Sequence, residues 1–420
     1  GGKYFKEMWI IVFIGSFLVP SLLGQSCNFK WTIGANPLKI SSPYYPENYI
    51  PGWACEWKVT AFADYNIQLT CTDVNIPNTL LGDVTDRLTG GRINICAPYN
   101  IGLMRFQPDY IQVSPKGSDY YEDATTYCGT DSFTVTSVSN TMNIRFKAQP
   151  KSSGGRFTCT LKRIANPCSC GRHKDYRIYG GQNADLHDYP MLAVIVDGIK
   201  RELYCGATII SPRFALTAAQ CISGRDPSKI GLAVGEYDIS TGTDTEYTAL
   251  HRIESTRIHP YTILNGIGLV KTVEEIELNI GVALACLPFK YIYDSFTGRK
   301  VEVEGWGALE YGGLKPNILQ KVQLDVVDLE MCRPIDGSVT SNNNICTYTP
   351  GKGLCEFDSG NGLLYTDILY GRVHVIGVVV GGKSCSPPIS PVISMRVTSF
   401  LEWIQMISEG FEYCNTGYID

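Results

Sequence analysis

Between residues 25 and 165, apolar and polar residues alternate with a period of two. The alternation runs through Ile67–Cys71 and again through Phe133–Val138, as expected for strands with one buried face. Gly, Pro, Asn and Asp separate these runs, and no stretch repeats its apolar residues at the helical period. The pattern therefore predicts an all-β sandwich for this part of the chain.

The apolar run Met8–Gly24 has the length of the apolar core and cleavage region of a secretory signal peptide, and it is short for a membrane span. We expect residues 1–24 to be removed after Gly24, with Met8 as a candidate true start. The alternative is a single-span anchor. No other apolar run is long enough to cross a bilayer, so we expect no span in the mature chain.

The amino-acid composition indicates the compartment in which the protein is found. The 16 cysteines of the 420-residue chain are not arranged in paired C-x-x-C zinc spacing, so they predict disulfides in a secreted, extracellular protein. The formal net charge of -5 gives no electrostatic case for binding nucleic acid. The length suggests two domains.

Five motifs occur in order across the first region: Ile40–Tyr49 with Cys55–Trp57, Asp109–Val113, Tyr127–Gly129, Asn143–Phe146 and Gly155–Phe157. They resemble a CUB domain, which we assign to residues 25–165. The resemblance implies the disulfides Cys27–Cys55 and Cys96–Cys128. Cys71 and Cys159 remain, both in predicted strands, and we pair them.

CUB domains mostly bind other proteins, and many do so through a calcium ion held by acidic loop residues. Asp109 matches one such position, while the carboxylate expected after the strand Ile67–Cys71 is not clearly present. A spacer without an ion is the open alternative.

Residues 166–177 are short, polar and basic, as expected for an exposed connector that a protease can cut. The connector leads into Arg177-Ile178-Tyr179-Gly180-Gly181, which resembles the activation site of trypsin-like zymogens. In that family, cleavage after the arginine frees an ammonium that pairs with the aspartate before the nucleophilic serine. That aspartate is here Asp358.

Further motifs follow in order: Cys205–Ser211, Ala215–Cys221, His259–Tyr261, Asn265–Val270, Ala285–Pro288, Gly305–Gly307, Asn344–Cys346, Gly377–Gly382 and Arg396–Ile404. Together they resemble the chymotrypsin/trypsin-like serine proteases over residues 178–410, with a tail at 411–420. The resemblance implies two six-stranded β-barrels and a C-terminal helix near Val397–Ile407.

The catalytic motifs are altered. Cys355–Gly362 resembles the nucleophile loop C-x-G-D-S-G-G-P and keeps Asp358 and Ser359, but Phe357 replaces the oxyanion glycine. Gln220 replaces the histidine base, and Gly266 replaces the aspartate that orients it. A carboxamide has no useful basicity near neutral pH, so it cannot take the serine proton.

Neither the remaining positions of the substrate cleft nor the histidines of the chain supply a substitute for the missing base. Val380 to Gly382 stands where the family pairs with the substrate backbone, and Gly353 matches the base of the primary pocket, which implies no specificity for basic residues. None of the five histidines aligns with the base. We interpret His259 and His374 as structural or surface residues.

For the second domain, the resemblance implies Cys205–Cys221, Cys332–Cys346 and Cys355–Cys385, with Cys286 bonded to a linker cysteine. Cys168 and Cys170 both qualify. We take Cys170–Cys286, which leaves Cys168–Cys414 and would keep the CUB domain attached after cleavage at Arg177.

Cofactors are otherwise not expected. Glu236 and Glu246 bracket a loop that in some trypsins holds calcium through oxygen ligands. A solvated acidic loop is the alternative.

The sequence therefore predicts a secreted, catalytically inactive serine protease homologue that binds extracellular proteins, such as an active protease or its substrate. It resembles CUB-containing proteins of arthropod venom and haemolymph, and cleavage after Arg177 would switch it as a cofactor or adaptor. One alternative is an active endopeptidase with an atypical site. The other is a decoy for inhibitors or substrates.

Overall fold

The structure is a computed structural model. It describes residues 26–77, 96, 99–101, 104–106, 108–173, 182–184, 186–241, 244–260, 266–308, 314–334, 337, 339–340, 343–354, 357–382 and 390–414. The expected signal peptide, the Arg177–Ile178 junction and the Cys355–Cys385 pair lie outside these residues. Among the described residues, no helix has the length and apolar character needed to cross a membrane.

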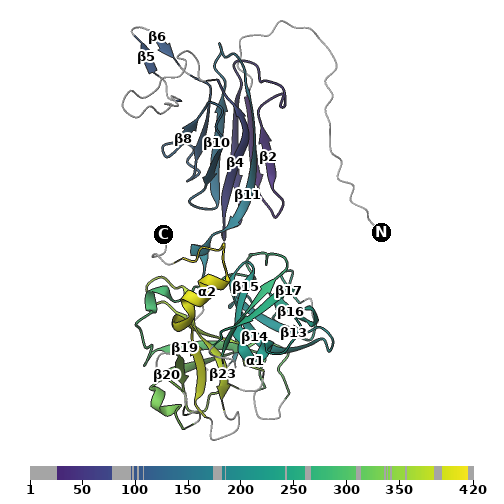
Figure 1. Ribbon diagram of the computed structural model, residues 1–420, viewed down its shortest axis with the longest axis vertical. Helices are drawn as coiled ribbons and strands as arrows, with labels where there is room; N and C mark the ends of the chain where they lie inside the picture. Colours follow the sequence, from purple (N-terminus) through teal and green to yellow (C-terminus); the bar gives the residue numbers. More distant parts are fainter. Residues whose placement is uncertain are drawn as a thin grey trace.

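The N-terminal domain is a sandwich of two sheets (Figure 1). The first sheet has the order β1 (Ser26–Thr32), β3 (Ala54–Thr60), β10 (Thr141–Lys147), β7 (Tyr110–Ser114) and β8 (Thr125–Tyr127). The second has the order β2 (Leu38–Ser41), β11 (Arg156–Ala165), β4 (Tyr65–Asn75) and β9 (Phe133–Thr136), and β5 (Tyr99–Ile101) and β6 (Met104–Phe106) form a separate hairpin. The predicted strands are confirmed, since Ile67, Leu69 and Cys71 of β4 are fully buried.

The C-terminal domain contains two barrels. The first is closed in the order β13 (Leu192–Asp197), β14 (Glu202–Ser211), β15 (Phe214–Ala218), β18 (Ile267–Thr272), β17 (Ala249–Ile258) and β16 (Ile230–Val234). The second has the order β20 (Gln320–Val327), β19 (Lys300–Gly305), β22 (Gly362–Thr366), β23 (Val373–Gly382), β24 (Val392–Arg396) and β21 (Asn344–Thr347). Pairing of β20 with β21 closes this barrel, and β12 (Gln182–Asn183) pairs with β20.

The described helices are short. They are α1 (Ala219–Ile222) and α2 (Leu401–Ile407), with 3-10 turns η1 (Pro167–Ser169), η2 (Pro227–Lys229), η3 (Phe289–Tyr291), η4 (Leu329–Met331) and η5 (Val397–Phe400). The expected C-terminal helix thus begins as a 3-10 turn and becomes α-helical at Leu401. Helix α2 lies at the end of the barrels that is nearest the sandwich (Figure 1).

Seven disulfides join described cysteines, and all seven are pairs expected from the sequence: Cys27–Cys55, Cys71–Cys159, Cys96–Cys128, Cys168–Cys414, Cys170–Cys286, Cys205–Cys221 and Cys332–Cys346. The open choice between Cys168 and Cys170 is resolved because Cys170 is buried in the protease domain, where the amide of the next residue, Gly171, donates to the Leu284 carbonyl and its carbonyl accepts from Val373.

The described part of the connector, residues 166–173, is docked rather than free, which differs from the exposed segment that its polar sequence predicts. Arg172 pairs with Asp64, a buried CUB residue, at 2.8 Å. The amide of Leu278 in the protease domain donates to the hydroxyl of Tyr65 at 2.7 Å. These polar contacts and two disulfides fasten the domains to each other.

The hydroxyl of Tyr65 gives a direct test of this joint. We expect Tyr65→Phe to lower the free energy of unfolding by about 1–2 kcal/mol, because the buried Leu278 amide loses its acceptor. Chemical denaturation of the full chain measures this loss. Tyr120→Phe, at a side chain that is 85% exposed, is the control and is expected to change stability by less than about 0.5 kcal/mol. Equal effects of the two substitutions would contradict the role given to Tyr65.

Candidate active site

The turn that carries Ser359 is held in place by hydrogen bonds to both barrels, through β14 of the first and β23 of the second. The carbonyl of Ser359 accepts from the Gly206 amide at 2.9 Å, and the Gly360 amide donates to Val379 at 2.8 Å. Gly360 has a φ of +90°, and a Cβ there would lie 2.2 Å from the Gly206 carbonyl oxygen. Only glycine fits such a position, so the local geometry of the nucleophile turn is retained.

Gln220 lies where a general base would stand. Helix α1 follows β15 directly and presents the carboxamide to the serine, with Nε2 3.5 Å from Ser359 Oγ. The same Nε2 donates to the carbonyl of Val380 at 2.7 Å. The amide nitrogen of Gln220 is a hydrogen-bond donor to the serine hydroxyl, and no group in this contact can accept the proton of the serine.

Gly266 occupies the place of the orienting carboxylate. It precedes β18, and its carbonyl accepts from the Ala219 amide at the start of α1 at 2.8 Å. The backbone therefore brings this position next to Gln220 as the sequence predicts. With no side chain at Gly266, nothing from this position can orient a base or stabilise its charge.

The two histidines considered in the sequence lie elsewhere. The ring of His259 packs edge-on against Phe400 and Trp403, and burial lowers its pKa. His374 is 1% exposed and its Nδ1 lies 3.2 Å from the Arg372 carbonyl oxygen. Burial lowers the pKa of His374 to about 4. Among the described residues, Ser359 Oγ has a hydrogen-bond contact with Gln220 and with no histidine.

Phe357 places an aromatic side chain near Ser359 where the family has a glycine, and this side chain is 40% exposed. Its φ of +77° is in the left-handed region, which disfavours a side chain. The Lys315 ammonium lies 3.4 Å from the centre of the Phe357 ring and donates to the Leu203 carbonyl at 2.7 Å. Burial lowers the pKa of Lys315. Phe357 and Lys315 thus form a cation–π pair near Ser359. No sequence motif marks Lys315.

Asp358 points into a recess behind Ser359. Cβ atoms at Gly305 and Gly307 would lie 2.7 Å and 2.3 Å from its carboxylate oxygens, so both glycines are needed to admit the side chain. Asn361, which replaces the second glycine of the G-G pair, is 2% exposed and donates to Asp358 at 3.3 Å. The junction expected to supply a partner to Asp358 lies outside the described residues.

The substrate-pocket positions are partly visible. Val380 is buried and its carbonyl is bonded to Gln220. Gly382 ends β23 and pairs with Val392, and Gly353 lies in the loop after the bridge between Thr349 and Lys352. Residues 383–389, which follow Gly382, lie outside the described part.

Of the candidate calcium residues, Asp109 is fully engaged in hydrogen bonds within the CUB domain, whereas Glu236 has a buried Oε2 without a hydrogen-bond partner among the described residues. Asp109 is buried and accepts from the Tyr49 hydroxyl at 2.9 Å, the Gln149 amide at 2.7 Å and the Ser152 hydroxyl. In the loop from Glu236 to Glu246, it is Asp244 that accepts the amides of Tyr237 and Asp238. Within the described residues, no group of three or more His, Cys, Asp or Glu side chains could hold a metal ion.

Glu236 should make stability depend on pH. Burial, with Asp244 adding to it, raises its pKa from 4.5 to about 7. A carboxyl whose pKa is higher in the folded state favours folding fully below its unfolded value, and this contribution is lost as pH rises through about 7. Because the side chain is only half-buried, we expect Glu236→Gln to gain about 1–2 kcal/mol relative to the native chain between pH 4.5 and pH 8.

Urea unfolding at pH 4.5, 6 and 8 measures this gain. Glu246→Gln, in the same loop, controls for removing one negative charge. Parallel stability curves for the native chain and Glu236→Gln would show that Glu236 is not the titrating group.

Comparison with known proteins agrees with this architecture. The trypsin family model matches residues 178–404, and the CUB domain model matches residues 27–87. Venom serine protease 34 of Apis mellifera is 31% identical over 96% of this chain and 94% of its own length. A venom serine protease of Polistes dominula is 35% identical over 59% of this chain and 91% of its own.

The clotting factor G beta subunit of Tachypleus tridentatus is 30% identical over 61% of this chain and 88% of its own length. The double barrel, the retained serine turn and these matches lead to one assignment. The chain belongs to the trypsin family of serine proteases, and its protease domain follows a CUB domain.

Proposed function

We propose that this protein is a secreted serine protease homologue that does not hydrolyse peptides and acts by binding other extracellular proteins. The observation that carries the proposal is the position of the Gln220 carboxamide, which donates to Ser359 Oγ and to the Val380 carbonyl. It replaces the base, so Ser359 has no route for its proton.

The same contact favours a cleft that is closed to substrates. In the protease family, the segment equivalent to Val380–Gly382 pairs with the substrate backbone. Here the Val380 carbonyl already accepts from Gln220, and the Leu203 carbonyl accepts from Lys315. A peptide would have to displace both side chains to reach these acceptors.

The disulfides and the relatives support the extracellular setting. Seven disulfides form within the described residues, as is typical of oxidising compartments. The relatives are named as venom proteases and as a clotting factor subunit. Cleavage after Arg177 would act as the switch, and Cys168–Cys414 would keep the two domains joined afterwards.

The experiment that tests this proposal is labelling of the purified chain with a fluorophosphonate serine probe, before and after cleavage at Arg177. A broad peptide-substrate screen runs in parallel, with an active trypsin as positive control. We expect neither labelling of Ser359 nor turnover. Turnover that disappears in Ser359→Ala would overturn the proposal and would mean that the site has another base.

A further inference from the structure

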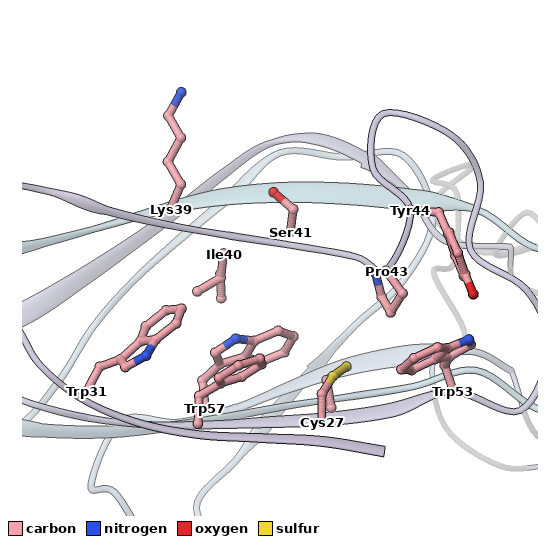
Figure 2. Close-up of a pocket in the computed structure, with 11 residues that line it drawn as sticks. Cys27, Trp31, Lys39, Ile40, Ser41, Pro43, Tyr44, Trp53 and Trp57 are labelled. Atoms are coloured by element: carbon pink, nitrogen blue, oxygen red, sulfur yellow. A yellow bond between two sulfur atoms is a disulfide. The ribbon is translucent and has the colours of Figure 1, made fainter. Parts of the chain in front are cut away.

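A groove of about 440 Å³ opens between the two sheets of the CUB domain, where β1 and β2 form neighbouring edges (Figure 2). Its main lining residues are Phe29, Trp31, Lys39, Tyr44, Trp53 and Trp57. Phe29 and Trp31 lie on one face of β1, two residues apart, and this face turns toward the interior of the sandwich. Phe29 is nevertheless 39% exposed.

Both strands beside the groove have a free edge. β1 pairs only with β3, and β2 pairs only with β11, among the strands that the structure describes. The outer edge of a terminal strand offers unpaired amides and carbonyls to an added strand. A strand added to β1 would project every second side chain into the groove and complete the cover of Phe29 and Trp31.

One end of the groove carries two unusual features. Tyr44 is 56% exposed and its φ of +68° lies in the left-handed region, where a bulky residue is strained. Strained exposed residues of this kind point to a binding role. Beside Tyr44, with a ring-centre distance of 6.1 Å, lies Trp53, whose indole nitrogen is buried without a hydrogen-bond partner among the described residues.

The lysine residues in and beside the groove indicate which class of ligand it favours. Lys39 is the one charged residue that lines the groove, and Lys30 projects from the opposite face of β1. Neither forms an ion pair with a described residue. Lys58, which lies across from Lys30 on β3, pairs with Asp119, and Lys30 adds a weaker electrostatic attraction to the same carboxylate. An outward-facing carboxylate on an added strand would lie beside Lys30 and form the favourable cross-strand pair.

We propose that this groove binds an extended peptide of about five to seven residues, which adds to the edge of β1, places apolar side chains in the groove and presents Asp or Glu to Lys30. Binding of a carbohydrate instead of a peptide is an outcome that the experiment below distinguishes. The site lies wholly in the CUB domain. Its occupation is therefore independent of the chemistry at Ser359, and failure of either proposal leaves the other standing.

The test is selection of a phage-displayed library of random 12-residue peptides on the immobilised full-length chain. Parallel selections use Phe29→Asp, Lys30→Glu and the control Lys147→Glu, which reverses an exposed charge two strands away on β10. We expect enriched peptides to alternate apolar residues with Asp or Glu. They should bind Phe29→Asp at least about tenfold more weakly. Lys30→Glu should instead select Lys or Arg, and Lys147→Glu should select as the native chain does.

A second measurement tests strand addition and does not depend on whether Phe29→Asp folds. One enriched peptide is synthesised in two forms, N-methylated at alternate amides in complementary sets. Because a strand offers every second amide to a given neighbour, one form should lose binding at least about tenfold and the other should retain it. Equal effects of the two sets would overturn strand addition. No enriched peptides, with binding only to glycans on an array, would overturn the peptide proposal.

Discussion

The triple variant Gln220→His, Gly266→Asp, Phe357→Gly is expected to gain Ser359-dependent hydrolysis after cleavage at Arg177, at least about 10³-fold above the native chain. The serine turn is already formed by Gly206 and Gly360, and the residue 220 side chain already points to Ser359 Oγ. The substitutions therefore return a base, its orienting carboxylate and an unobstructed oxyanion site to a scaffold that still holds the nucleophile.

The partial variants make this expectation sharper. Gln220→His alone should raise the hydrolysis rate only slightly, because the effects of residues that act as a unit are strongly non-additive. The double variant that keeps Phe357 should be less active than the triple variant, because the side chain obstructs the site that the residue 357 amide serves. The upper limit of this loss is about 10²–10³-fold, the range for loss of one oxyanion donor. Ester turnover with Ser359→Ala as the background measures each step. Full activity from Gln220→His alone would mean that Gly266 and Phe357 do not impair the site.

Gly206→Ala is expected to destabilise the protease domain by about 3 kcal/mol, which is large for one methyl group. A Cβ at Gly206 would lie 1.6 Å from Asn361 Oδ1 and 2.8 Å from the Asn361 amide nitrogen. Because Asn361 is 2% exposed and bonded to Asp358, its side chain has no free space to move into. Chemical denaturation of the full chain measures the change.

A double-mutant cycle isolates the cause. In an Asn361→Gly background, Gly206→Ala should cost at least about 1.5 kcal/mol less, since the nearest atom is then gone. Gly337→Ala, at a glycine with open space around its Cβ position, is the control and should be near neutral. Additive effects of Gly206→Ala and Asn361→Gly would show that the two positions do not compete for space.

The order of the sequence motifs was enough to predict most of the fold and of the candidate site. The positions Gln220, Gly266 and Ser359 could be found because each stands within a recognisable sequence of neighbours, and the structure brings the three together. The disulfide choice at Cys168 and Cys170 remained open, because two cysteines separated by one residue look alike in sequence. It was decided by the burial of Cys170 in the protease domain, next to Cys286.

The sequence by itself determined the two all-β domains, their order and the presence of a carboxamide, Gln220, in place of a histidine, since strand periodicity and residue chemistry are local properties. Only the tertiary structure decided that Gln220 bonds to Val380, that Lys315 covers Phe357 and that Asn361 takes the space next to Gly206. The groove between β1 and β2 was likewise revealed only by the tertiary structure. Its residues come from separate segments on two sheets, so their proximity exists only once the sheets have packed together.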